Sequence, residues 1–193
     1  MRNENKFQIA GQEIAPGERW QGTLTIGGGE FALPAAVLHG EEEGKTVLIT
    51  AAVHAGEYVG VQTAVELSRE LNIEKVTGTI VIVKVVCTDE FEQRTGSVCP
   101  EDDRNLNREF PGDSKGTKMQ RLAYAIEKEL HSVADYYIDL HSGDDYEDLT
   151  PYVYYAGEGE KDVVQISRKM AQHVDVPYMV RSNVSSGGSY NYA

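Results

Sequence analysis

The sequence predicts an α/β domain with a mixed, mostly parallel sheet, helices on both faces of the sheet and an antiparallel N-terminal lead-in. Two nearly continuous apolar runs, residues 46–53 and 79–86, are typical of strands buried on both faces. Between them, residues 61–71 place apolar side chains on one helical stripe. This strand–helix–strand order predicts a right-handed crossover between parallel strands, and its continuation along the chain predicts the fold class.

The remaining elements follow from the same patterns. Residues 20–26 alternate as a strand does, and residues 31–38 are the expected hairpin partner across three glycines. Further along, the chain alternates again: a helix from about residue 117 to 131, a strand at 135–140, a fourth strand at 151–156, a helix at about 162–174 and a short strand near 178–181. We expect one domain spanning residues 1–193.

Composition excludes several classes of protein. A net charge of −13 repels phosphate backbones, so we expect no nucleic-acid partner. No apolar run approaches the roughly 20 residues of a membrane span, and the charged N-terminus lacks the apolar core of a signal peptide. The two cysteines, Cys87 and Cys99, are too few for a disulfide framework or a structural zinc site. We therefore expect a cytoplasmic protein that does not bind membranes.

Three metal-ligand side chains follow two of the predicted buried strands. His54 and Glu57 come directly after the first, and His141 comes directly after the third. Because ligands gather at the carboxyl ends of strands in such sheets, we expect these side chains to converge. Two histidines and one glutamate are the ligand set of several zinc hydrolases, with water in the fourth position. The sequence therefore predicts one Zn²⁺ per chain.

A simpler interpretation of these residues remains open. Each histidine could be an ordinary hydrogen-bonded residue at a strand end, and Glu57 could be an acid that stabilises a helix N-terminus. The chain would then be an α/β domain without a metal. Convergence of all three at one edge of the sheet favours the metal site. The other histidines, His39, His131 and His173, are expected at the surface.

A long polar segment, residues 87–115, carries the other candidate residues, and loops of this length in compact domains are usually functional or disordered. Asn107 and Arg108 stand between Leu106 and Phe110, which indicates that this part packs down. An amide and a guanidinium held near a metal would bind a carboxylate. A second guanidinium, from Arg94, could polarise a scissile carbonyl group.

Taken together, residues 54–57 (His-Ala-Gly-Glu), 107–112 (Asn-Arg-Glu-Phe-Pro-Gly) and 139–141 (Asp-Leu-His) resemble the succinylglutamate desuccinylase/aspartoacylase family. These proteins are zinc hydrolases related to the M14 carboxypeptidases. The resemblance runs from about Gly44 to the end of the chain. It implies a zinc-carboxypeptidase-like fold. The implied roles are zinc ligation by His54, Glu57 and His141, binding of the substrate's amino-acid carboxylate by Asn107 and Arg108, and oxyanion stabilisation by Arg94.

The chain departs from the family pattern in three places. Ala55 replaces the usual glycine, a small change. Asn105 stands where an aspartate usually supports a zinc histidine; its amide oxygen can still accept the imidazole N–H, without the negative charge. The family's general base is a glutamate on a late strand, and no residue up to Ala193 matches it. We expect the base beyond residue 193, in a C-terminal part of the family fold that this chain lacks.

The predicted function is zinc-dependent hydrolysis of the amide bond of an N-acyl amino acid or a similar small amide that bears a carboxylate. One alternative is an M14-type metallocarboxypeptidase acting on short peptides. Another is a non-catalytic module that binds metal or carboxylate, since the general base is missing. The partner is in each case a small molecule or a short peptide, and the sequence leaves a homo-oligomer open.

Overall fold

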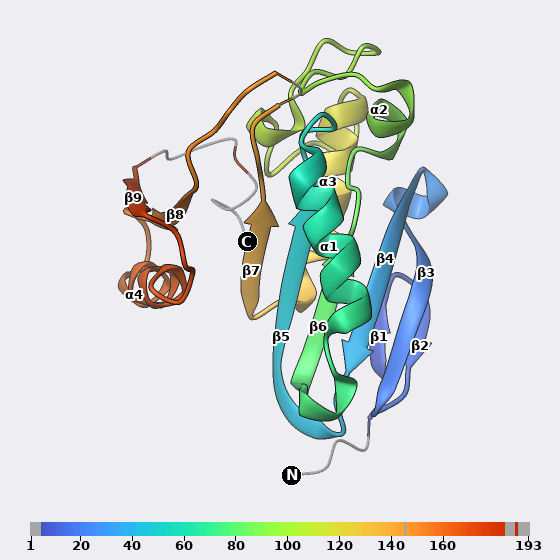
Figure 1. Ribbon diagram of the computed structural model, residues 1–193. Helices are drawn as coiled ribbons and strands as arrows, with labels where there is room; N and C mark the ends of the chain where they lie inside the picture. The colour runs from blue at the N-terminus through green and yellow to red at the C-terminus, as the bar shows by residue number, and fades with distance from the viewer. Residues whose placement is uncertain (1–4, 145, 184–187, 189–193) are drawn as a thin grey trace.

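The computed structural model describes residues 5–144, 146–183 and 188, and its centre is a five-stranded sheet. The strand order is β3-β4-β6-β5-β7 (Figure 1). The bounds of these strands are Glu18–Ile26 for β3, Phe31–His39 for β4, Glu42–Ala51 for β5, Thr77–Val83 for β6 and Tyr136–Leu140 for β7. Strands β6, β5 and β7 run parallel, whereas β3 and β4 are antiparallel to their neighbours. The sheet is therefore mixed, as the sequence predicts.

Two helices cover opposite faces of this sheet (Figure 1). Helix α1, Tyr58–Glu70, connects β5 to β6, and helix α3, Lys118–Glu129, precedes β7. Each face has its own apolar cluster, because successive strand residues point to opposite sides. On the α3 side, Leu48 and Val81 pack with Leu122, and on the α1 side, Ile49 and Ile82 pack with Ala64. The buried strands and the α1 crossover confirm the predicted α/β arrangement.

The predicted hairpin forms, and a smaller one precedes it. Strands β3 and β4 pair over their whole length across the short 3-10 helix Gly27–Gly29. Before them, β1 (Phe7–Ile9) and β2 (Gln12–Ile14) make a tight hairpin. Its turn residues, Ala10 and Gly11, both have positive φ, as a two-residue hairpin turn requires.

The last elements depart from the prediction. The predicted strands at 151–156 and 178–181 exist as β8 (Tyr152–Ala156) and β9 (Tyr178–Ser182), joined by helix α4 (Lys161–Ala171). They pair with each other in parallel and form a separate two-stranded sheet instead of extending the central one. The loop after β7 leads the chain away from that strand (Figure 1), so β7 is the edge of the central sheet in the described part of the chain.

The remaining short helices lie between these elements. They are α2 (Thr88–Gln93) and the 3-10 helices Ile73–Lys75, Leu106–Arg108 and His131–Val133. Within the described ranges, no helix combines the length and the apolar character needed to cross a bilayer.

Two of the three histidines predicted at the surface are buried. His39 is 3% exposed at the end of β4, where its Nδ1 lies 2.8 Å from the Thr79 hydroxyl, and His131 is 6% exposed. Each imidazole has a hydrogen-bonding neighbour, which reduces the cost of burial. The surface prediction is therefore wrong for these two residues and correct for His173, which is exposed.

His131 occupies the core between two aromatic rings. Its ring lies 5.8 Å from that of Phe110 and 4.7 Å from that of Tyr137, and its Nδ1 is 3.1 Å from the Glu127 carboxylate. Burial lowers the pKa of His131 below its ordinary 6.5, although Glu127 opposes this change. The folded protein therefore holds this imidazole neutral more firmly than the unfolded chain does.

This lowered pKa predicts a stability change on acidification. Below about pH 6.5 the unfolded chain protonates His131 while the folded chain resists, so the free energy of unfolding falls as the pH drops. His131→Phe removes the titrating group while keeping an aromatic ring. Urea unfolding between pH 7.5 and 5.5 should show a smaller loss of stability for His131→Phe than for the wild type. Equal losses for both proteins would contradict the prediction.

Candidate metal centre

The candidate ligands lie where the central strands β5 and β7 end. After β5, the chain turns through Ala52, which has a left-handed φ of 54°, and reaches His54. The Glu57 N–H donates to the His54 carbonyl oxygen at 3.2 Å, and α1 begins one residue later. His141 directly follows β7, which pairs with β5 in parallel. Parallel pairing therefore brings residues 54 and 141 to the same edge of the sheet.

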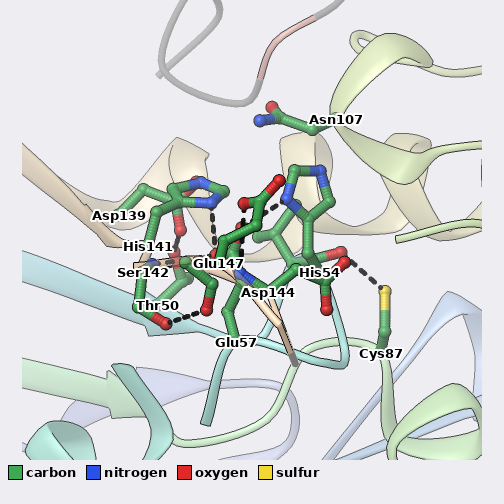
Figure 2. A network of polar contacts seen from close by, with 12 residues as sticks. Thr50, His54, Glu57, Cys87, Asn107, Asp139, His141, Ser142, Asp144 and Glu147 are labelled. Atoms are coloured by element: carbon green, nitrogen blue, oxygen red, sulfur yellow. Dashed lines mark hydrogen bonds and ion pairs between the residues drawn. The ribbon is translucent and has the colours of Figure 1, made fainter. Parts of the chain in front are cut away.

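The structure brings all three predicted ligands together. Glu57 Oε1 lies 2.8 Å from His54 Nδ1, and Glu57 Oε2 lies 2.7 Å from His141 Nδ1. One ligand atom from each residue lies within 4.8 Å of the other two. In Figure 2 the two imidazole rings stand on either side of the site, and their centroids are 5.1 Å apart. The group therefore has the donor types and the spacing of a three-ligand metal site.

The outer nitrogens of both histidines face oxygen atoms. His54 Nε2 lies 3.1 Å from Asn105 Oδ1, and His141 Nε2 lies 2.9 Å from Asp139 Oδ2. Asn105 Oδ1 also accepts the Asn107 N–H at 2.9 Å, which fixes the orientation of that amide. Since an oxygen acceptor needs a donor, both Nε2 atoms carry the hydrogen. Neutral rings then direct the lone pairs of both Nδ1 atoms towards the Glu57 carboxylate, and only a proton or a cation relieves that contact.

The pKa values at the site also show that the Glu57 carboxylate needs a positive charge beside it. Burial raises the pKa of Glu57, but the hydrogen bonds and charges of His141 and His54 outweigh burial and lower the pKa to about 2. Burial lowers the pKa of His141, but the charges and hydrogen bonds of Asp139 and Glu57 raise it to about 10. Without a cation, a proton on His141 balances the two carboxylates. A divalent ion held by the same three side chains would take the place of that proton.

Asp139 is a site residue that the sequence analysis did not select. It lies on β7 two residues before His141, and its second oxygen accepts the Thr50 hydroxyl from β5 at 2.6 Å. The period of two along a strand puts residues 139 and 141 on the same side, so the spacing contained a usable signal. The carboxylate orients the His141 ring and increases its basicity as a ligand.

Of the two predicted carboxylate-binding residues, Asn107 is the one that the structure places near the centre. Leu106 and Phe110 are buried, as expected. Their burial anchors the 3-10 helix Leu106–Arg108 to the core. Asn107 is 9% exposed, and Figure 2 shows its amide above the two imidazole rings. Arg108 is exposed, and its Nη1 donates to the Asn107 carbonyl oxygen at 2.7 Å. This loop therefore places the Asn107 amide near the centre, with the Arg108 guanidinium held against the Asn107 backbone.

The remaining predicted site residue, Arg94, lies on a different element. It caps the C-terminus of α2 with a left-handed φ of 55°, and its side chain is exposed. Together with Tyr58 and Phe91, it lines a half-open hollow of about 320 Å³. Tyr58, one of the three lining residues, directly follows Glu57 in the sequence.

The fold and the site define a class of protein. A mixed α/β sheet that carries two histidines and one glutamate at its carboxyl edge is the arrangement of metal-dependent amidohydrolases. Residues 43–193 match the succinylglutamate desuccinylase/aspartoacylase catalytic domain. The chain belongs to that family.

Individual relatives are similar over most of this chain. A curated relative, the N-alpha-acetyl-L-2,4-diaminobutyric acid deacetylase of Halomonas elongata, is 35% identical over 126 residues, which are 64% of this chain and 36% of the relative. A succinylglutamate desuccinylase structure from Silicibacter sp. TM1040 is 31% identical with a TM-score of 0.76, covering 85% of this chain and 50% of that one. The product-bound ectoine utilization protein EutE from Ruegeria pomeroyi is 27% identical with a TM-score of 0.78, covering 98% and 59%. The chain thus spans 50% and 59% of the lengths of these two structures and 36% of the curated relative.

The ligand geometry predicts metal binding by this chain. We expect about one equivalent of zinc per chain after loading and removal of free metal. His141→Ala and His54→Ala should each lower the bound amount well below one equivalent, because two ligands hold the ion poorly. His173→Ala, which removes an exposed histidine far along the chain, is the matched control and should bind as the wild type does. Full occupancy in both site variants would exclude the assigned ligands.

The contact between Asp139 and His141 predicts a partial loss of zinc affinity when the Asp139 charge is removed. Asp139→Asn keeps the shape of the side chain and removes its charge, so zinc affinity should fall about 10- to 100-fold without loss of the ligands themselves. Competition with a chromophoric chelator measures this change. The reciprocal variant, Asn105→Asp, adds a charge beside His54 and should tighten binding. Unchanged affinity in both variants would refute the role given to these outer partners.

Proposed function

We propose that this protein is a zinc-dependent deacylase that hydrolyses the amide bond of an N-acyl amino acid. The observation that carries the proposal is the Glu57 carboxylate shared between two histidine Nδ1 atoms, with both outer nitrogens held by oxygen acceptors. Imidazole and carboxylate ligands in this number suit Zn²⁺. Relatives named as a deacetylase and as desuccinylases support the choice of an acyl amino acid over other amides.

His54, Glu57 and His141 would hold the ion. Zinc bound there would supply a water of lowered pKa and an electrophile for the acyl carbonyl group. Arg94 would donate to the developing oxyanion, as the family resemblance implies, and its exposed guanidinium has the positive charge that this role requires.

Asn107 and Arg108 would bind the carboxylate of the amino-acid portion. Two observations support this assignment: the Asn107 amide lies above the two imidazole rings in Figure 2, and Arg108 is its exposed neighbour on the same 3-10 helix. A guanidinium fork matches a carboxylate in shape and charge, and the amide adds a donor. This pair therefore favours a substrate with a free carboxylate next to the scissile bond.

The described residues form one catalytic domain in this proposal, and the general base is a glutamate beyond residue 193. The family resemblance is the basis for that base. The relatives' greater length is consistent with a residue of this kind outside the part that they share with this chain.

Hydrolysis assays on the zinc-loaded protein test the proposal. Nα-acetyl-L-2,4-diaminobutyrate, other N-acyl amino acids and peptides with free C-termini form the panel, and we expect turnover of acyl amino acids in preference to peptides. Arg108→Ala should raise KM about 10- to 100-fold through loss of a charged hydrogen bond. Arg168→Ala, on the exposed side of α4, is the control.

Three outcomes would contradict the assignment. Preferential cleavage of peptides would make the protein a carboxypeptidase. Zinc binding without turnover of any substrate, in a polypeptide that includes the region beyond residue 193, would leave a binding module. Hydrolysis that survives His54→Ala would remove the metal centre from the reaction altogether.

A further inference from the structure

A line of hydrogen bonds runs from the α3 side of the central sheet to the candidate ligand His141. The Tyr137 hydroxyl oxygen lies 2.8 Å from Thr50 Oγ1, and Thr50 Oγ1 donates to Asp139 Oδ1 at 2.6 Å. The other oxygen of Asp139 lies 2.9 Å from His141 Nε2. Thr50 and Asp139 are paired residues of β5 and β7, and residues two apart on a strand share a face. The pairing of the two strands therefore holds the whole line in register.

The Asp139 carboxylate fixes the direction of each hydrogen in this line. An ionised carboxylate only accepts hydrogen bonds, so the single hydroxyl hydrogen of Thr50 goes to Asp139. Thr50 then offers only lone pairs to Tyr137, so the phenol O–H donates to Thr50. The Asp139 side chain is 5% exposed, and bonds to a charged group are the strong ones. The two hydroxyl groups therefore hold Oδ1 in place and leave Oδ2 for His141.

The ring of Tyr137 is fixed from the side of the core. Its centroid lies 4.7 Å from that of the His131 ring, and the His131 ring in turn stacks on Phe110 with an interplanar angle of 18°. His131 and Phe110 are both buried, and Tyr137 packs against the apolar cluster on the α3 side. The line of hydrogen bonds thus begins at an anchored side chain whose place is set by the fold.

We propose that Tyr137 and Thr50 are positioning residues for the metal ligand His141, on which they act through the Asp139 carboxylate. The inference rests on the metal centre of the proposed function and adds two residues that lie behind it. A histidine whose outer nitrogen is held by an oriented acceptor is itself oriented as a ligand. When either hydroxyl group is lost, Asp139 can turn, and His141 Nδ1 faces the metal position in a smaller share of the molecules.

Zinc affinity, measured by competition with a chromophoric chelator, tests the inference without requiring turnover. Thr50→Val keeps the shape of the side chain and removes the direct donor, so affinity should fall about tenfold. Tyr137→Phe acts one hydrogen bond further away and should lower affinity about threefold. Thr50→Ser keeps the hydroxyl group and should restore most of the affinity. Tyr136→Phe removes a hydroxyl group on the opposite face of β7, and this control should bind zinc as the wild type does.

A double variant separates positioning from packing. In Asp139→Asn the support of His141 is already weakened, so adding Tyr137→Phe should lower zinc affinity by much less than it does in the wild type. Loosened packing around the ring would give additive losses instead. The visible absorption bands of the cobalt-loaded protein report on ligand geometry and give a second readout. These bands should shift in Thr50→Val and stay unchanged in Tyr136→Phe.

The outcomes separate this inference from the proposed function. Zinc affinities of Tyr137→Phe and Thr50→Val equal to that of the wild type would overturn the inference and leave the proposed reaction standing. Additive losses in the double variant would do the same. Dependence of zinc affinity on both hydroxyl groups, in a protein that hydrolyses no acyl amino acid, would uphold the inference and overturn the proposed reaction. Absence of zinc binding by the wild type would overturn both.

Discussion

The Glu57 carboxylate is the interaction on which the site depends. Its two oxygens each contact the Nδ1 atom of a different histidine, and it is 7% exposed. A buried carboxylate without a positive charge beside it would cost several kcal/mol, so the surrounding groups must supply one. The outer oxygens on both histidines prevent the rings from turning their N–H groups inwards. The fold thus presents a negative centre that only a proton or a metal ion satisfies.

Sheet topology makes this contact between residues that are 84 positions apart. Strand β5 lies between β6 and β7 and pairs with both in parallel, so all three strands end at the same edge of the sheet. The hydrogen bond from Thr50 on β5 to Asp139 on β7 links the two strands just before the ligands appear. The site therefore inherits its geometry from the register between the buried strand β5 and the edge strand β7.

The sequence predicted those strands because their apolar runs have few alternatives, and the ligands followed from their ends. The prediction failed where the deciding contacts are long-range. The residues of β8 and β9 have strand character, yet nothing local says which partner they choose, and they pair with each other. The burial of His39 and His131 depends likewise on Thr79 and Phe110, which are distant in sequence. Asp139, in contrast, could have been predicted, because residues two apart on a strand point to the same side and His141 follows it by two.

Charged groups connect the loop that supports His54 to helix α3. Lys118, the first residue of α3, is 11% exposed in its side chain, and its Nζ lies 3.0 Å from both Asp89 and Glu90 and 3.5 Å from Glu101. Burial alone lowers the pKa of Lys118, but Asp89 and Glu90 outweigh burial and raise the pKa. The cation thereby ties α2 and the following loop to the start of α3.

Asp102, which follows Glu101, connects the start of α3 to the residues beside the site. Its carboxylate accepts the Met119 N–H of α3 at 2.9 Å and the Arg104 N–H at 3.3 Å. Arg104 immediately precedes Asn105, the partner of His54. A ligand at the end of β5 is therefore oriented through a loop whose shape is set at the beginning of α3, on the opposite face of the sheet from α1. The long polar segment is thus held to α3 by these charged groups, while its residues Leu106 and Phe110 belong to the apolar core.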